Sequence, residues 1–237
     1  MYILALESTG PHASVDVIDE KGKVTELNNE GTLNHLENLM PMARELLDGA
    51  GIALSDITAI AASAGPGSFT GIRIGVTTVR ALAQTLGIPA ISVETLKSFA
   101  YGAKDFDGVI CSCIDARRNQ CYAGAFKWED GKLIDKISAG PYMIDEFLEM
   151  VSGLGEKCLF FGDGLIRYGE KIYALEGAEG ASPEKRLQHG GYVAKMALDI
   201  YNEGGMIDYA ALEPIYMRKA EAERKREERL KNGSAGN

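Results

Sequence analysis

The residues best suited to bind a ligand lie in one glycine-rich segment, Gly65-Pro66-Gly67-Ser68-Phe69-Thr70-Gly71, with Arg73 two positions beyond it. Glycine permits positive φ and close backbone approach, and such a turn directs backbone N–H groups toward an anion at a helix N-terminus. The segment has neither the Lys-Ser or Lys-Thr pair of a Walker loop nor the dinucleotide-binding glycine spacing. Two interpretations therefore stay open: a ligand loop, and a tight crossover that lets a helix pack closely on a sheet.

Two carboxylates end apolar runs at equivalent places in the two halves of the chain. Glu7 closes the first run, and Asp115 follows the run at 109–114. A second glycine turn, Gly162-Asp163-Gly164, follows another apolar run at 157–161. Ligands favour the carboxyl ends of strands in open α/β sheets. We therefore expect Glu7, Asp115 and both glycine turns to lie at the mouth of one cleft.

The expected secondary structure repeats, with Glu7 and Asp115 separated by 108 residues and Gly22 and Gly131 by 109. Hydrophobic periodicity predicts strands and helices in the same order in each half. The expected strands are 1–7, 13–18, 23–28, 58–63, 89–93, 109–114, 120–128, 133–138 and 157–161, and the expected helices are 34–49, 72–86, 144–151 and 189–201. This order predicts two βββαβα lobes, 1–104 and 105–220.

Three further local features carry expectations. Pro41 predicts a kink or a start in the first helix, because proline disturbs a helix interior. The small, polar residues 176–185 predict a loop, and 214–218 form a short closing segment. The tail 221–237 has charged pairs at helical spacing but no apolar stripe, so we expect a frayed helix or disorder.

The composition is that of a soluble globular protein. The 237 residues are 46% hydrophobic and 25% charged, without an apolar run long enough to span a bilayer. No basic segment precedes the first apolar run, so a signal peptide is not expected. The four cysteines form no C-x-x-C pair, which favours small buried hydrophobes of a reducing cytoplasm over metal ligands. His12, His35 and His189 are too far apart in the sequence for a helical or turn-borne ligand pair.

The net charge of −9 is unevenly distributed along the chain. Residues 219–237 contain six Lys or Arg and four Glu, which leaves 19 positive and 30 negative residues in the rest of the chain. A body with a net charge of −11 repels phosphate backbones. Tight nucleic-acid binding by this chain alone is therefore not expected.

Four segments, in this order, resemble one known family: Ala5-Leu6-Glu7-Ser8-Thr9, the glycine-rich segment through Arg73, Ile114-Asp115-Ala116-Arg117, and Pro214-Ile215-Tyr216-Met217-Arg218. The chain resembles the TsaB (YeaZ) family of bacterial tRNA threonylcarbamoyladenosine biosynthesis proteins over about residues 1–220. The resemblance implies a duplicated α/β fold of the actin-like ATPase (ribonuclease H-like, sugar kinase and Hsp70) class. It also implies a cytoplasmic role in adding a threonylcarbamoyl group to the adenosine next to the anticodon of tRNA.

The resemblance further implies which proteins share the reaction. A paralogous subunit, TsaD, makes the transfer and is bound and supported by TsaB, while the ATPase TsaE joins the assembly and TsaC supplies threonylcarbamoyl adenylate. The chain would then have no catalytic residue and no cofactor of its own, with ATP and Mg²⁺ left to the assembled complex. It would meet tRNA only through that complex, would not contact a membrane, and would form a homodimer when alone. The alternative is a small-molecule kinase or ATPase of the same fold, which ATP turnover would reveal.

The resemblance also locates a degenerate nucleotide cleft. Actin-like kinases hold metal-bound water near the phosphates with a carboxylate at the end of the first strand of each lobe, and Glu7 and Asp115 match these positions. The first loop lacks a glycine between its acid and Thr9, whereas Arg117 and Arg118 add positive charge to the second. In the alternative interpretation, Asp115 and Arg117 form a structural pair that pins the hairpin. The cleft residues expected are Glu7, Ser8, Thr9, Asp115, Arg117, Gly162, Asp163 and Gly164.

The helix 72–86 is apolar nearly all round, which predicts either burial on both sides or an interface. Its second face is uncharged and opposite the face expected to enter the core. We predict that this face and the preceding helix pack on TsaD or on a second copy of the chain. A neighbouring helix that covers the whole face is the alternative. The predicted interface residues are Leu39, Met42, Ile74, Thr78, Ala81, Leu82 and Thr85.

Overall fold

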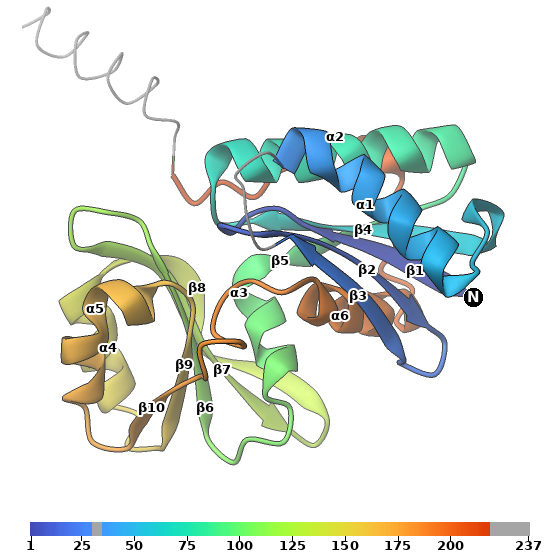
Figure 1. Ribbon diagram of the computed structural model, residues 1–237. Coiled ribbons are helices and arrows are strands. Elements are labelled where there is room, and N and C mark those ends of the chain that lie inside the picture. Colours follow the sequence, from blue (N-terminus) through green and yellow to red (C-terminus); the bar gives the residue numbers. More distant parts are fainter. Residues whose placement is uncertain (30–34, 219–237) are drawn as a thin grey trace, which may run out of the picture.

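The computed structural model describes residues 1–29 and 35–218, which form two mixed five-stranded sheets (Figure 1). The strand order is β3-β2-β1-β4-β5 in the first sheet and β10-β9-β6-β7-β8 in the second. The strands of the first sheet are β1 (Tyr2–Glu7), β2 (Ala13–Asp19), β3 (Val24–Asn29), β4 (Ile57–Gly65) and β5 (Ala90–Glu94). Those of the second are β6 (Val109–Asp115), β7 (Gln120–Glu129), β8 (Lys132–Met143), β9 (Cys158–Phe161) and β10 (Ala178–Gly180).

The two sheets have the same topology. The central strand β1 is antiparallel to β2 and parallel to β4, and β6 is likewise antiparallel to β7 and parallel to β9. The long apolar run of β1 is buried because core residues cover both of its faces. The predicted duplication and its actin-like fold class are therefore confirmed.

Helices and short helical turns cover both faces of each sheet (Figure 1). α1 (His35–Ala50) and α2 (Phe69–Leu86) pack on one face of the first sheet, and α6 (Gly190–Asn202) packs on the other. α4 (Ile144–Ser152) and α5 (Gly164–Tyr173) cover the second sheet. The short α3 (Thr95–Ser98) lies between the sheets, and the 3-10 turns are η1 (Leu54–Asp56), η2 (Phe99–Gly102) and η3 (Tyr209–Ala211).

The position of α6 differs from the expected lobe division. Although α6 falls within the lobe expected at 105–220, its side chains Val193, Ala194 and Ala197 are fully buried against the first sheet. The chain beyond α6 stays there, since the backbone of Ile207 pairs with Ala90. The sequence alone does not predict that α6 packs on the first sheet, because this packing depends on which apolar face of the folded chain is still exposed to solvent.

Element boundaries differ from prediction for local reasons. α2 begins at Phe69 instead of Ile72, because the Ser68 side chain accepts a hydrogen bond from the Gly71 N–H at 3.2 Å and caps the helix. α1 continues through Pro41, so the expected start at that residue is wrong. The predicted loop 176–185 contains β10, which pairs in parallel with β9. The expectation for the tail 221–237 lies outside the described residues. Within the described residues, no helix has the length and hydropathy that crossing a membrane requires.

Candidate functional site

The turn after β1 is closed on itself. The N–H and the hydroxyl of Thr9 both donate hydrogen bonds to Glu7 Oε1, at 2.5 and 2.7 Å. Glu7 and Ser8 have no exposed surface, and Thr9 is 2% exposed. The three residues of the first turn that were predicted to line a degenerate nucleotide cleft are therefore buried.

The glycine-rich segment is what buries this turn. The Ser8 hydroxyl donates to the carbonyl oxygen of Gly71 at 2.8 Å, and the Ser68 N–H donates to that of Thr9 at 2.8 Å. A Cβ added to Gly71 would overlap the carbonyl oxygen of Ser8, and one added to Gly67 would lie 2.7 Å from that of Thr9. Only glycine permits so close an approach at these two positions. The geometry thus matches the tight crossover, the second of the two interpretations of the segment.

Two buried acids lie on the α6 side of the first sheet. Burial raises the pKa of Glu7, while hydrogen bonds involving Ser63 and Thr9 lower it. Burial also raises the pKa of Asp16 well above its ordinary value, in spite of the hydrogen bond that Ser14 Oγ donates to Asp16 Oδ2. The other oxygens, Glu7 Oε2 and Asp16 Oδ1, have no hydrogen-bond partner within the described chain, and neither does Gln188 Oε1.

Neither Asp16 nor Gln188 was among the predicted site residues. A carboxylate between two valines in the middle of a strand was the one signal available for Asp16. Nothing comparable marks Gln188, which lies where the chain returns to the first sheet. A Cβ on Gly10 would be 2.8 Å from Gln188 Oε1, so this side chain packs directly on the turn after β1.

The second turn is organised by Asp115. Its Oδ1 accepts hydrogen bonds from the Arg117 N–H at 2.9 Å and from the Tyr168 hydroxyl at 2.8 Å. The Asp115 N–H donates to Asp163 Oδ1 at 2.8 Å, and burial raises the pKa of Asp163. Asp115 therefore holds the hairpin through the backbone N–H of Arg117. The alternative interpretation of the sequence expected Asp115 and Arg117 to form a structural pair. Gly162, with φ +98°, approaches the carbonyl oxygen of Cys113 so closely that a Cβ would overlap it.

The Thr9 N–H and the carboxylates of the two turns are already engaged by groups of this chain, so they are not free to bind a nucleotide. The backbone N–H of Thr9 is not free to bind a phosphate, because it already donates a hydrogen bond to Glu7 Oε1. At the second turn, Asp115 and Asp163 are engaged by groups of their own lobe.

The part of the chain that the structure describes holds no candidate metal site. Among the described residues, no group of three or more His, Cys, Asp and Glu side chains could hold a metal ion. Cys111, Cys113, Cys121 and Cys158 are free thiols buried in the core of the second sheet, as the sequence predicted.

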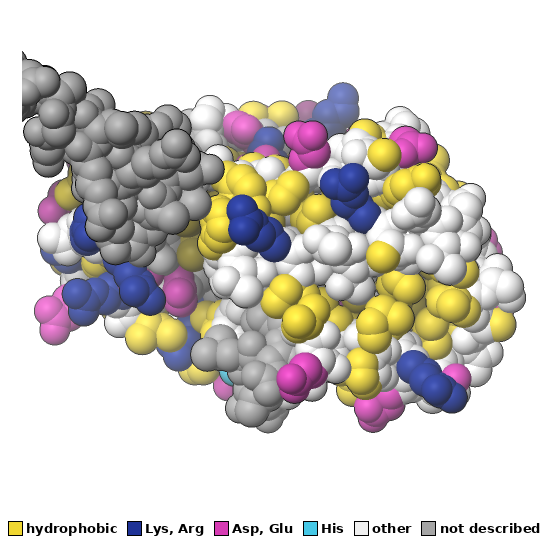
Figure 2. All heavy atoms as spheres, turned by 90° about the horizontal axis from the view of Figure 1, so that it is seen from above, with side chains coloured by type: hydrophobic (Ala, Val, Ile, Leu, Met, Phe, Trp, Pro, Cys, Tyr) yellow, Lys and Arg dark blue, Asp and Glu magenta, His cyan; other side chains and the backbone are white. Residues whose placement is uncertain are grey.

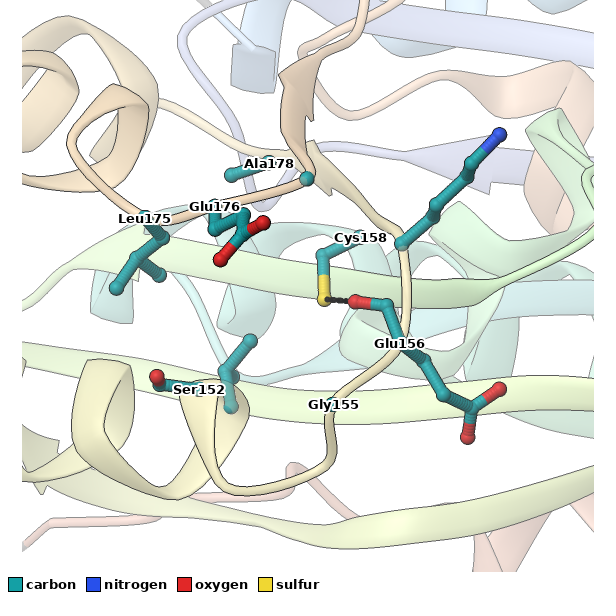
Figure 3. Close-up of a pocket in the computed structure, with 10 residues that line it drawn as sticks. Ser152, Gly155, Glu156, Cys158, Leu175, Glu176 and Ala178 are labelled. Atoms are coloured by element: carbon teal, nitrogen blue, oxygen red, sulfur yellow. Dashed lines mark hydrogen bonds between the residues drawn. The ribbon is translucent and has the colours of Figure 1, made fainter.

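One cavity lies at the opposite end of β9 from the second glycine turn (Figure 3). Its volume is about 460 Å³, and it is bounded by the end of α4, the start of β9 and the segment 175–178. The Cys158 thiol donates to the carbonyl oxygen of Glu156 at 3.2 Å, and the Glu156 side chain points away to pair with Lys127. None of the residues predicted for ligand binding lines this cavity.

The second face of α2 is exposed over part of its length. Ala81 and Thr85 are exposed, while Ile74, Thr78 and Leu82 are half-buried, so α1 does not cover the whole face. Figure 2, which looks down on the side of α1 and α2, shows hydrophobic side chains among few charged ones over this region.

The two residues of α1 predicted for the same interface are placed differently. Leu39 and Met42 are 1% and 7% exposed and belong to the core between α1 and the first sheet, which corrects the prediction. Leu36 and Met40 are instead 72% and 47% exposed. The reason is that the apolar stripe of α1 is needed to cover the sheet, so only residues on its other side can meet a partner.

The repeated topology, with an acid as the last residue of the first strand of each lobe, defines a protein of the actin-like ATPase fold class. A family model described as "TsaD: tRNA N6-adenosine threonylcarbamoyltransferase" matches residues 29–157. The tRNA threonylcarbamoyladenosine biosynthesis protein TsaB of Bacillus subtilis is 32% identical over 225 residues, which cover 95% of this chain and 97% of that protein. Its namesake from Escherichia coli is 29% identical and covers 86% of this chain and 93% of its own length.

A solved structure agrees with these sequence comparisons. YeaZ from Pseudomonas aeruginosa has a TM-score of 0.76 at 27% identity, covering 91% of this chain and 99% of its own. The chain belongs to the TsaB (YeaZ) family, as the four segments of the sequence predicted.

Proposed function

We propose that this chain is a non-catalytic subunit required for threonylcarbamoylation of the adenosine next to the anticodon in tRNA. It binds and supports a catalytic paralogue of the TsaD family, and the ATPase TsaE joins the assembly. The chain alone forms a homodimer through the surface with which it contacts the TsaD paralogue. In this proposal, tRNA is bound by the assembled complex. The names of the relatives and the family model support the pathway, since the relatives are named for threonylcarbamoyladenosine biosynthesis and the model for a tRNA N6-adenosine threonylcarbamoyltransferase.

The burial of Glu7, Ser8 and Thr9 is the observation that supports a non-catalytic role. A residue that acts on a nucleotide must reach its phosphates or its metal, and a side chain without exposed surface cannot do so unless the turn opens. ATP and Mg²⁺ are therefore assigned to the assembled complex and not to this chain.

The surface formed by α1 and α2 supports the proposal of a partner. The exposed Leu36 and Met40 lie on α1, and Ala81 and Thr85 lie exposed on α2, next to the half-buried Leu82. Small residues on α2 allow a second pair of helices to approach closely, and the larger side chains contribute apolar area. The arrangement fits a four-helix contact with the equivalent helices of a paralogue of the same fold.

Ala81→Arg tests this surface. Because Ala81 is exposed, the variant is expected to fold as a monomer, while an arginine buried unpaired in the complex costs about 3–5 kcal/mol. The measurement is co-purification of the full chain with TsaD of the same organism, together with the melting temperature of the free chain. Gln84→Arg adds the same charge on the flank next to Arg80 and is expected to keep the complex. Wild-type affinity of Ala81→Arg for TsaD would place the interface elsewhere.

A second assay addresses catalysis. The free chain is expected to modify no tRNA when given threonylcarbamoyl adenylate, and to show no catalytic turnover of ATP. Transfer to tRNA without another subunit would contradict the non-catalytic role. ATP turnover would support the alternative, a small-molecule kinase or ATPase of this fold.

A further inference from the structure

The closing segment of the chain connects the two sheets. The Ile215 N–H donates to the carbonyl oxygen of Ala64, at the end of β4, at 2.7 Å. Three residues later, Arg218 Nη1 donates to the carbonyl oxygen of Ala116 at 3.1 Å, and its other nitrogen contacts Gln120 Oε1. Residues 215–218 therefore connect the end of β4 in the first sheet to the turn after β6 in the second.

An aromatic and cationic stack lies at the first end of this span. The rings of Phe69 and Tyr216 are stacked with their centroids 4.7 Å apart and an angle of 26° between their planes. The Arg73 guanidinium lies 4.1 Å from the centre of the Phe69 ring and donates through Nε to the Tyr216 hydroxyl at 2.9 Å. Tyr216 nevertheless remains 40% exposed. An exposed ring next to a guanidinium is the combination on which an unpaired base stacks.

Two arginines at the other end of the span are held in a strained turn. Arg117, Arg118 and Asn119 have φ of +64°, +55° and +58°, in the left-handed region that residues other than glycine rarely adopt. The turn is kept in place by hydrogen bonds from the Arg117 N–H to Asp115 and from the Ile144 N–H to the Asn119 carbonyl at 2.9 Å. Strain of this kind persists where the surrounding contacts enforce it, and it concentrates at functional positions.

The turn displays its two charges to solvent. Arg117 and Arg118 are exposed, and neither side chain forms an ion pair with any carboxylate of the described chain. Between this turn and the stack lies Arg218, whose guanidinium is 5.6 Å from the centre of the Tyr122 ring. Only one residue separates Arg218 from Tyr216, so their Cα atoms are at most about 7 Å apart. The arginine turn and the stack are thus the ends of one continuous strip.

We propose that this strip, Arg73, Phe69, Tyr216, Arg218, Arg117 and Arg118, is an RNA-contact surface. The two turn arginines bind consecutive phosphates, and Tyr216 stacks on an unpaired base. The chemistry favours RNA over a small anion, because phosphates alone would leave the exposed aromatic ring without a role. The strip supplies local cations on a body whose net charge of −9 repels polyanions, so its contribution to affinity is modest and its main effect is to orient the RNA.

The proposal deepens the proposed function, on which its choice of RNA rests, but its test uses the full chain without partners. A fluorescent anticodon stem-loop RNA is titrated with the chain, and anisotropy is measured at about 50 and about 200 mM salt. In the test variant, Arg117→Asn and Arg118→Asn are combined, because asparagine tolerates the left-handed backbone. The matched control combines Lys21→Asn and Lys132→Asn, two exposed lysines in the other turns of the two sheets.

The wild-type chain and the lysine control are expected to bind the RNA weakly, with the same salt dependence. The arginine double variant is expected to lose about tenfold in affinity. The slope of its log affinity against log salt concentration is expected to fall by the amount that about two phosphate contacts contribute. Tyr216→Leu, which keeps an apolar contact with Phe69, is expected to lose about fivefold with an unchanged salt dependence.

Equal affinity of the arginine variant and the lysine control would overturn the proposal, as would the absence of any RNA binding by the wild-type chain. If the arginine variant instead loses co-purification with TsaD while RNA binding is unchanged, the strip contacts a protein and the RNA proposal is wrong. Failure of the proposed function has a different signature, since the wild-type chain would then bind no TsaD whatever its behaviour toward RNA.

Discussion

Ser8 and Gly71 are 63 residues apart in the sequence, yet the Ser8 hydroxyl donates a hydrogen bond to the Gly71 carbonyl oxygen at 2.8 Å, with both groups buried. This bond joins the turn after β1 to the first turn of α2. It requires the two backbones to approach so closely that no side chain fits at position 71. The glycine-rich segment and the closed turn that contains Ser8 and Thr9 are therefore parts of one packing arrangement.

Gly71→Ala is expected to destabilise the chain by several kcal/mol, since its Cβ would overlap the backbone oxygen of Ser8 and one of the two backbones must shift. Urea denaturation followed by circular dichroism measures the loss. Gly49→Ala, near the end of α1, has no atom within 4 Å of its added Cβ and is expected to be neutral or stabilising by up to about 1 kcal/mol. Equal stability of the two variants would mean that the turn and α2 are less closely packed than the structure shows.

Asp16→Asn is expected to change the pH dependence of stability. The pKa of Asp16 is raised by burial, so the folded state binds its proton more tightly than the unfolded state. The contribution of Asp16 to the free energy of unfolding therefore falls as pH rises from its unfolded pKa, near 3.8, through the higher folded value. Relative to wild type, the variant gains stability as pH is raised from about 5 to about 8, measured by urea denaturation.

Asp19→Asn on the same strand serves as the control for that measurement. Hydrogen bonds from the backbone of Lys23 and Lys21 lower the pKa of Asp19, so its contribution is present above the unfolded pKa and is lost as pH falls through the folded value. The control variant is therefore expected to lose stability at neutral pH and to approach wild type in acid. Parallel pH profiles for wild type and Asp16→Asn would show that the carboxylate of Asp16 is not desolvated.

Tyr168→Phe is expected to destabilise the second lobe by about 1–2 kcal/mol. The change removes the hydroxyl that donates to Asp115 Oδ1 and leaves a half-buried carboxylate with one partner fewer. Tyr173→Phe, on the same helix but 59% exposed, is expected to change the free energy of unfolding by less than about 0.5 kcal/mol. If Tyr168→Phe were as stable as the control, the hydrogen bond from Tyr168 to Asp115 would not contribute to the stability of the hairpin.

Leu39→Ala and Met40→Ala are expected to differ although the two residues are neighbours. Leu39 is 1% exposed in the core, so its truncation costs about 2–5 kcal/mol of monomer stability. Met40 is 47% exposed, and its truncation changes monomer stability by less than about 0.5 kcal/mol while weakening the proposed contact with TsaD. Thermal melts and co-purification together check both effects, and a stable Leu39→Ala variant would contradict the core assignment.

The sequence by itself determined the order of the elements and their duplication. Local properties carry this information: the apolar run of β1, the hydrophobic period of α2 and the turn chemistry around Gly22 and Gly131 act over a few residues each. The family resemblance also rests on short segments whose residues are consecutive. The burial of all four cysteines followed from the same local reasoning, because Cys111 and Cys113 point to one face of an apolar strand.

Only the tertiary structure decided which side chains remain accessible. Glu7 ends an apolar strand, a position compatible with an open site, yet the folded chain leaves it no exposed surface, while Gly67 and Gly71, about 60 residues later, pack on the neighbouring Thr9 and Ser8. Leu39 and Met40 have similar hydrophobicity, and only the packing of α1 on the first sheet separates core from surface. The return of α6 to the first sheet has the same origin, because burial depends on the sum of contacts from distant segments, which no local pattern contains.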